Sequence, residues 1–240
     1  MGNPKHYSIE LPGRCLKLID ELWSTASEIR APHRPDLGPL TSTFLLSMSM
    51  PILNIPVERI ERHIGKPEGA AYADDRSFSP EAVEAFDAVI RHGRLGDAPF
   101  YADGAWRFVD IREEPFPNIA DGLPDDVTDR LSEDQARAEA WKMDARQWIS
   151  VLRNAMAHGG IAYLDADGRS NYDRPVKMYA FVSGKYGKPK CKHADAECHY
   201  GMGALEKLYV LRISEDDYLR FLRQWVAWLT EKGIIRRSAA

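Results

Sequence analysis

The fold class that the sequence predicts depends most on one stretch of the chain, Ala145-Arg-Gln-Trp-Ile-Ser-Val-Leu-Arg-Asn-Ala-Met-Ala-His-Gly-Gly160. Its apolar residues recur at helical spacing, and the same pattern continues back to Trp141. Such a pattern is typical of a helix with one buried face. Two glycines end the pattern, as glycine commonly does just beyond a helix. We therefore predict a long helix that begins at Ser132 and ends at His158.

Helical patterns also cover most of the chain on either side of this stretch. Pro51 and Pro56 fall inside one of them, and we expect each to kink or interrupt its helix, because proline removes a backbone donor and crowds the preceding turn. The first two predicted helices should pack antiparallel, and the chain is expected to be mainly α-helical. Apolar spacing and cap residues predict these further helices over residues 16–32, 41–64 and 79–93, and after Ser214.

Two short β-prone runs, 176–182 and 208–213, flank a loop rich in glycine and lysine. They predict a β-hairpin with a long insertion. Glycine, proline and acidic residues dominate 96–129, where the surroundings of Trp106 favour a short strand within a long loop. The predicted organisation is a single domain over 1–240, with a loop-rich insertion at about 94–131 and a Cys/His/Lys-rich loop at about 184–203.

Composition and charge limit the classes of protein to which the chain can belong. Charged residues make up 28% and hydrophobic residues 44% of the 240 residues, as in ordinary globular proteins. The net charge of -4 excludes a generally basic nucleic-acid-binding protein, so any RNA contact needs a local patch. The longest apolar stretch, 44–55, is shorter than the ~20 residues of a membrane span. Three cysteines do not make a secreted disulfide framework, so the expected location is cytoplasmic.

Arg153, Asn154 and His158 lie within about a turn and a half of the predicted helix. Asn154 and His158 share a face of that helix, whereas Arg153 is rotated by ~140° from His158. Histidine exchanges protons near neutral pH, and arginine holds a phosphate with a planar fork of donors. These side chains can cleave a phosphodiester without a metal, which makes them candidate catalytic residues. The alternative is that His158 only caps the helix or lies at the rim of the core.

Residues 152–159, Leu-Arg-Asn-Ala-Met-Ala-His-Gly, resemble the R-x4-H signature of the HEPN superfamily, including the polar residue after the arginine. Residues 43–59 are also similar to the helical layout of bacterial HEPN-like proteins. The resemblance implies a HEPN-like helical bundle, here with a small β-hairpin attachment. It further implies a homodimer that brings two motifs together over one RNA-cleaving cleft, with Arg153 and His158 catalytic and Asn154 supporting them.

The resemblance makes a metal-independent endoribonuclease of HEPN type the leading hypothesis, with cleavage by attack of the ribose 2′-hydroxyl. Because many relatives are toxins or anti-phage defence effectors, an antitoxin or regulator protein is a further expected partner, and a membrane is not. In HEPN toxins that nucleotidyl transfer silences, a tyrosine lies two residues after the histidine, but here that position is Gly160. The alternative hypothesis is a non-catalytic HEPN-like module that binds RNA, a nucleotide or a partner protein.

Four candidate metal ligands fall between lysines and glycines: Cys191, His193, Cys198 and His199. Their types suit tetrahedral zinc, and Asp195 or Glu197 can replace one of them. Their spacing does not match the paired knuckles of ordinary structural zinc sites, which favours a solvated loop with free thiols. The expectation is therefore no cofactor, and zinc is the alternative, in which case the chain is a metal-stabilised interaction protein.

The same loop carries four lysines with no acid among them: Lys185, Lys188, Lys190 and Lys192. Such a patch can bind RNA phosphates, and Tyr186 or Tyr200 can stack on a base. The alternative is an ordinary solvated loop.

Overall fold

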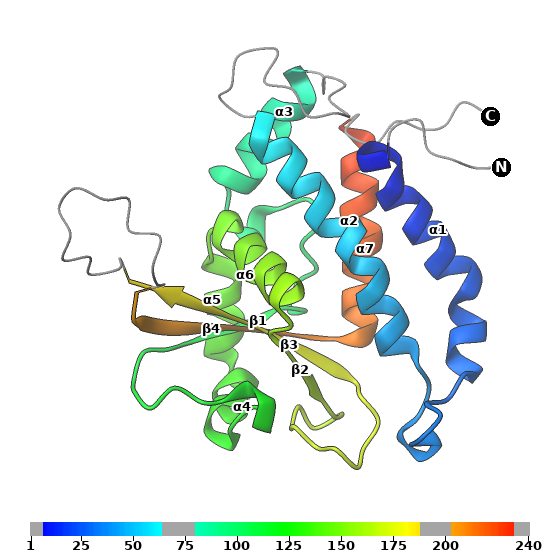
Figure 1. Ribbon diagram of the computed structural model, residues 1–240. Helices are drawn as coiled ribbons and strands as arrows, with labels where there is room; N and C mark the ends of the chain where they lie inside the picture. The colour runs from blue at the N-terminus through cyan, green and yellow to red at the C-terminus, as the bar shows by residue number, and fades with distance from the viewer. Residues whose placement is uncertain (1–6, 64–79, 188–202, 233–240) are drawn as a thin grey trace, which may run out of the picture.

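A four-stranded antiparallel sheet lies at the centre of the part of the chain that the structure describes, residues 7–63, 80–187 and 203–232 (Figure 1). The structure is a computed structural model. The protein has an α+β fold, so the expected mainly α-helical bundle with a small β-hairpin attachment is wrong. In the sheet order β1-β4-β3-β2, the strands are β1 (Arg107–Ile111), β4 (Leu205–Ser214), β3 (Met178–Tyr186) and β2 (Ile161–Leu164).

The predicted hairpin forms the middle of this sheet. β3 and β4 pair antiparallel with Val182 opposite Val210, which confirms the hairpin. β1 pairs with the outer side of β4, and β2 pairs with the outer side of β3. The fold class is wrong because these two short strands extend the hairpin into a full sheet. β1 confirms the short strand that the sequence predicts near Trp106, inside the loop-rich range 94–131, but its pairing with β4 was not predicted.

Helices account for most of the remaining described chain. α1 and α2 lie side by side and run antiparallel, as predicted (Figure 1). No helix in the described ranges is long and apolar enough to cross a bilayer. The α-helices are α1 (Tyr7–Glu28), α2 (Thr41–His63), α3 (Pro80–Phe86), α4 (Asp125–Ser132), α5 (Asp134–Lys142), α6 (Ala145–His158) and α7 (Glu215–Glu231), and the short helical turns are η1 (Pro35–Leu37), η2 (Asp87–Arg91), η3 (Leu95–Asp97) and η4 (Ile119–Asp121).

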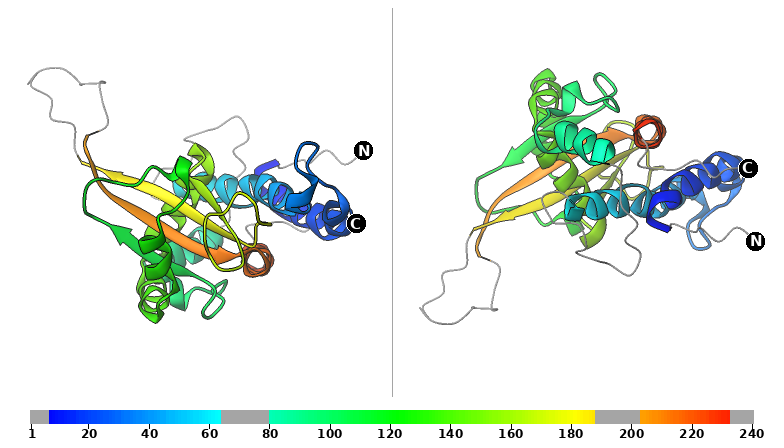
Figure 2. Two further views of the ribbon diagram at one scale, coloured as in Figure 1. Left: turned by 90° about the horizontal axis from the view of Figure 1, so that it is seen from below. Right: turned by 90° about the horizontal axis from the view of Figure 1, so that it is seen from above.

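Helices cover both faces of the sheet, with α4 and α5 on one side and α2 and α6 on the other (Figure 2). Successive side chains of a strand point to opposite faces. Phe181 and Leu211 therefore join the larger core with α6 and α7, whereas Val182 and Val210 join a smaller core with α4. Because both faces are covered, the middle of β3 is a continuous run of buried residues without polar alternation.

The long helix predicted over 132–158 is wrong in its extent. The chain instead forms α5 and α6, with a break between them. At this break the backbone N–H of Leu95 donates to the carbonyl oxygen of Met143 at 2.8 Å, and the N–H of Ala145 donates to that of Gly93 at 3.0 Å. These bonds to a neighbouring segment replace helical hydrogen bonds. The helical spacing of apolar residues therefore continues through 143–144, although the helix is broken there.

α2 runs through both of its prolines without interruption. Of the two predicted effects of Pro51 and Pro56, a kink or an interruption of the helix, the interruption therefore does not occur. Pro56 has no N–H to donate to the carbonyl oxygen of Ile52, four residues earlier. The indole Nε1 of Trp225 in α7 donates to this oxygen at 3.1 Å instead. Because Trp225 is buried, an unpaired carbonyl at this point would be costly. α7 thus supplies the hydrogen bond that α2 lacks.

Trp225→Phe is expected to lower the free energy of unfolding by about 1 to 3 kcal/mol, because it leaves the carbonyl oxygen of Ile52 unpaired in the core. Urea unfolding of the wild type, both single variants and the double variant with Pro56→Ala measures this. Pro56→Ala restores a backbone donor, so it should reduce the cost of Trp225→Phe. An equal cost in both backgrounds would contradict this role of Trp225.

An aromatic cluster in the larger core fixes the position of α6. Trp148 of α6 stacks on Phe100 with ring centroids 5.4 Å apart. Phe221 and Trp225 of α7 contact the same Phe100 ring edge-on. The apolar face of α6 is thereby held against α7 and the sheet, which determines where its C-terminal end reaches the surface.

Candidate functional site

The motif at 153–158 occupies the C-terminal turns of α6, as predicted. Gly159 follows in the left-handed region with φ of 73°, and the N–H groups of Gly159 and Gly160 both donate to the carbonyl oxygen of Ala155. A left-handed glycine is a common end of a helix. The carbonyl oxygen of Gly160 then accepts a hydrogen bond from the N–H of Val182 at 2.7 Å. The two glycines thus turn the chain from α6 into β2.

The two glycines should differ in how they tolerate alanine. A Cβ on Gly160 would lie 2.3 Å from the carbonyl oxygen of Val182, whereas a Cβ on Gly159 would meet no atom within 4 Å. Gly160→Ala is expected to cost about 3 kcal/mol through backbone overlap, and Gly159→Ala about 1 kcal/mol through its positive φ. Urea unfolding measures both. A cost for Gly160→Ala no larger than that for Gly159→Ala would show that β3 does not approach this closely.

Arg153 is directed toward α2, where its Nη1 lies 3.3 Å from Oε2 of Glu61. The two side chains are 34% and 30% exposed. Only Nη1 makes this contact, and Nε and Nη2 have no acceptor among the described residues. The carboxylate therefore positions the guanidinium while leaving donors for a phosphate. Glu61 could not be predicted as a site residue from the sequence, because it lies 92 residues from Arg153 and its only signal is its position beside the buried Ile60.

Asn154 and His158 emerge on the neighbouring side of α6. Nδ2 of Asn154 lies 3.5 Å from Oγ of Ser183 in β3, at the long end of hydrogen-bond distances. His158 is exposed and makes no hydrogen bond or ion pair with a described residue. The structure thus gathers the three predicted side chains at one end of α6, but within the described chain no hydrogen bond or ion pair joins Arg153 to His158.

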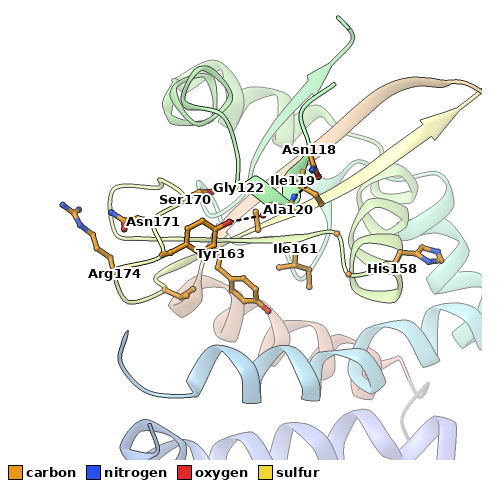
Figure 3. A pocket seen from close by; sticks show the side chains of 15 residues that line it. Asn118, Ile119, Ala120, Gly122, His158, Ile161, Tyr163, Ser170, Asn171 and Arg174 are labelled. Carbon is orange, nitrogen blue, oxygen red and sulfur yellow. Dashed lines mark hydrogen bonds between the residues drawn. The ribbon is translucent and has the colours of Figure 1, made fainter. Parts of the chain in front are cut away.

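A groove of about 620 Å³ begins at His158 and follows the outer edge of β2 (Figure 3). Residues 158–163 form one side, and segments at 118–122 and 170–176 contribute the remaining walls. Figure 3 shows His158 at one end of the groove and Arg174 at the other. The volume falls in the range of ~300 to 1,000 Å³ that is usual for small-molecule sites. The groove could not be predicted from the sequence, because only tertiary contacts bring its three segments together.

The predictions for the Cys/His/Lys-rich loop lie mostly outside the described residues. This holds for the candidate zinc ligands and their substitutes and for three of the lysines: Cys191, His193, Asp195, Glu197, Cys198, His199, Lys188, Lys190 and Lys192. Lys185 belongs to β3, and its Nζ lies 3.5 Å from Oε2 of Glu206 in β4. A cross-strand acid therefore balances part of its charge. Within the described ranges, no group of three or more potential metal-ligating side chains occurs.

A second polar cluster is buried at the start of α7. Glu215, 9% exposed, accepts hydrogen bonds from Oγ1 of Thr41 at 3.1 Å, from Oγ of Ser42 at 2.7 Å and from the hydroxyl of Tyr179. Burial, and then the charge of Glu215, raise the pKa of Tyr179 well above its ordinary value. Because donors from α2 and β3 use this carboxylate, the cluster joins three elements of the fold and is not a candidate ligand site.

The buried Arg212 of β4 also has a structural role, because its guanidinium is hydrogen-bonded to neighbouring elements. Its Nη2 donates to the carbonyl oxygen of Leu131 at 2.9 Å, and its Nη1 donates to Oγ of Ser132 at 3.2 Å. Burial, with smaller contributions from the charges of Arg107 and Arg169, lowers the pKa of Arg212 to about 10. A cation is favourable at this place because it meets the C-terminal end of α4.

The end of α6 and the adjoining groove are thus the candidate functional site. Its accessible reactive groups are the imidazole of His158, the amide of Asn154 and the guanidinium of Arg153. Comparisons of the chain with protein-family models, with curated proteins and with solved structures found no match.

Proposed function

We propose that the protein is an endoribonuclease that cleaves RNA without a metal, with Arg153 and His158 as catalytic residues and Asn154 in support. The observation that carries this proposal is the placement of all three on the last turns of α6, with His158 at the end of a groove. Histidine transfers protons near neutral pH, and arginine stabilises negative charge that develops on a phosphate. Their accessible positions allow both groups to contact a bound phosphodiester.

The proposed reaction is attack of a ribose 2′-hydroxyl on the adjacent phosphorus. A base removes the hydroxyl proton, the P–O5′ bond breaks, and an acid protonates the departing 5′-oxygen. The products are a 2′,3′-cyclic phosphate and a 5′-hydroxyl. Arg153 stabilises the charge on the crowded phosphorane, and His158 transfers protons. Glu61 keeps the guanidinium of Arg153 in place.

Two subunits are needed to complete this site. On a regular helix such as α6, Arg153 is rotated by ~140° and displaced by ~7.5 Å from His158, and Glu61 holds it toward α2. A twofold dimer in which two α6 ends meet can place Arg153 of one subunit beside His158 of the partner subunit. Each such pair of Arg153 and His158 is then one site, and a dimer has two of them.

Incubation of the wild type with single-stranded RNA of mixed sequence in EDTA tests the proposed function. We expect fragments with 2′,3′-cyclic phosphate and 5′-hydroxyl ends, identified by mass spectrometry, and no cleavage of a DNA copy. Cleavage that requires added metal and leaves 3′-hydroxyl ends would contradict the proposal. A dimer that binds RNA or a nucleotide without cleaving RNA would instead favour the non-catalytic module.

We extend the proposal to the cell, where such an activity suits a toxin or an anti-phage defence effector that acts on cytoplasmic RNA and that an antitoxin or regulator protein restrains. Expression of the wild type should then arrest growth, whereas expression of His158→Ala at the same level should not. Equal growth arrest by both proteins would show that the toxicity does not depend on His158.

A further inference from the structure

The edge of β2 that faces the groove has backbone groups that pair with no strand among the described residues. β2 is the last strand in the sheet order, with β3 on its inner side. The hydrogen bond from Val182 to Gly160 fixes the register, so the backbone groups of Ala162 face β3 and those of Ile161 and Tyr163 face the groove. A ligand in the groove can therefore bond directly to the N–H and C=O groups of this edge.

Two tyrosines give the groove an aromatic surface. Tyr163 is 49% exposed and Tyr172 is 68% exposed. The hydroxyl of Tyr172 donates to the carbonyl oxygen of Ala120 at 3.0 Å. Tyr163 contacts Tyr179 edge-on, with ring centroids 6.4 Å apart. Because these contacts position the rings in advance, a base can stack on them with little loss of freedom.

Two asparagines line the same groove. The side-chain oxygen of Asn118 accepts from the N–H of Ala120 at 3.1 Å, and that of Asn171 accepts from the N–H of Asp173 at 3.0 Å. These bonds fix the orientation of both amides, whose nitrogens have no acceptor among the described residues. Such nitrogens can donate to the carbonyl oxygens and ring nitrogens of an unpaired base.

Arg174 provides a cation at the end of the groove opposite His158 (Figure 3). Its Nη1 lies 2.8 Å from Oδ2 of Asp167 and 3.4 Å from Oδ2 of Asp165. Both contacts use the same nitrogen, so Nε and Nη2 have no acceptor in the described chain. No carboxylate is among the described residues that line the groove. Asp165 and Asp167 balance the charge of Arg174, but its Nε and Nη2 can still donate hydrogen bonds to a phosphate at this end of the groove.

We propose that this groove binds an unpaired nucleotide of the RNA, which makes single-stranded RNA the substrate class. The base stacks on Tyr163 and Tyr172, its polar edge meets the amides and the β2 backbone, and the flanking phosphates lie toward Arg174 and His158. A base within a duplex is already stacked and paired, so it cannot enter such a groove. The inference rests on the proposed function, because His158 would act on the phosphate at its end of the groove.

Binding can be measured without cleavage by using a short, fluorescently labelled, fully 2′-O-methylated single-stranded RNA, which has no free 2′-hydroxyl. Tyr163→Ala and Tyr172→Ala are each expected to raise its Kd for the full chain by about 5- to 150-fold, the range for loss of one base stack. Tyr172→Phe keeps the ring and loses only its tether to Ala120, so its effect should be smaller. Trp141→Ala, at an exposed aromatic residue of α5 outside the groove, should leave the Kd unchanged.

Several results would overturn the proposal: no binding of the single strand, equal binding of its duplex, or equal weakening by the groove variants and by Trp141→Ala. Thermal unfolding of each variant identifies any loss of folding, and Tyr172 is exposed enough that its replacement should leave the fold intact. The two proposals fail differently. Binding in the groove without RNA cleavage would contradict the proposed nuclease activity. RNA cleavage with an unchanged Kd in both tyrosine variants would instead contradict the proposed binding of RNA in the groove.

Discussion

His158→Ala is expected to lower the rate of RNA cleavage by about 100- to 10,000-fold, the usual contribution of one positioned proton-transfer group. The imidazole is exposed and makes no hydrogen bond or ion pair with a described residue, so its removal should not affect folding. Initial rates on a fluorescent single-stranded RNA in EDTA measure the loss. Thermal unfolding of the same preparations shows whether the variant stays folded.

His92→Ala is the matched control for this variant. His92 is also an exposed histidine, and its Nε2 lies 3.3 Å from Asp87, away from the groove lining. The control should cleave RNA at the wild-type rate. A His158→Ala protein that is folded and as active as His92→Ala would exclude His158 from the chemistry and would support its alternative interpretation as a residue at the helix end.

A mixture of Arg153→Ala and His158→Ala is expected to recover about a quarter of the wild-type activity, although each variant alone is inactive. If subunits pair at random, half of the dimers are mixed, and each mixed dimer retains one complete site of two. That site combines Arg153 of one subunit with His158 of the partner subunit. The measurement is the cleavage rate after the two proteins have been mixed and allowed to exchange subunits.

Arg146→Ala is the control for the arginine variant, because Arg146 is an exposed arginine on the same helix, two turns before Arg153. It should be active alone. Subunit exchange is verified with two different affinity tags. No recovery after verified exchange would mean that each subunit contains its own complete pair, and full activity in a strictly monomeric protein would exclude the shared site altogether.

The helices could be predicted from sequence where one face is apolar and a cap marks the start. Ser214 is an example, since its hydroxyl accepts the N–H of Asp217 at the start of α7 as its position predicts. The hairpin and the short strand near Trp106 could be predicted, but β2 and the pairing of β1 with β4, which comes from far along the chain, could not. Non-local pairing leaves no local signal. The break before α6 was missed for the same reason, because its hydrogen bonds come from the segment at 93–95.

In the candidate site, too, the features set by local helix geometry could be predicted, and those set by tertiary contacts could not. Helical spacing places Asn154 and His158 on one side of α6 and turns Arg153 away, and the contacts of Arg153 with Glu61 and of Asn154 with Ser183 agree with this. The sequence could not identify Glu61 as a neighbour or reveal the groove. Both arise where α2, β2 and two loops converge on the end of α6.

The most direct test of the proposed nuclease site uses an oligonucleotide that contains one ribose among deoxyriboses, incubated in EDTA with the wild type and with His158→Gln. The wild type should cut only after the single ribose and leave a 2′,3′-cyclic phosphate on that residue, whereas His158→Gln should leave the strand intact. Cutting at a deoxyribose linkage, or cutting by folded His158→Gln at the wild-type rate, would contradict RNA cleavage by the residues at the end of α6.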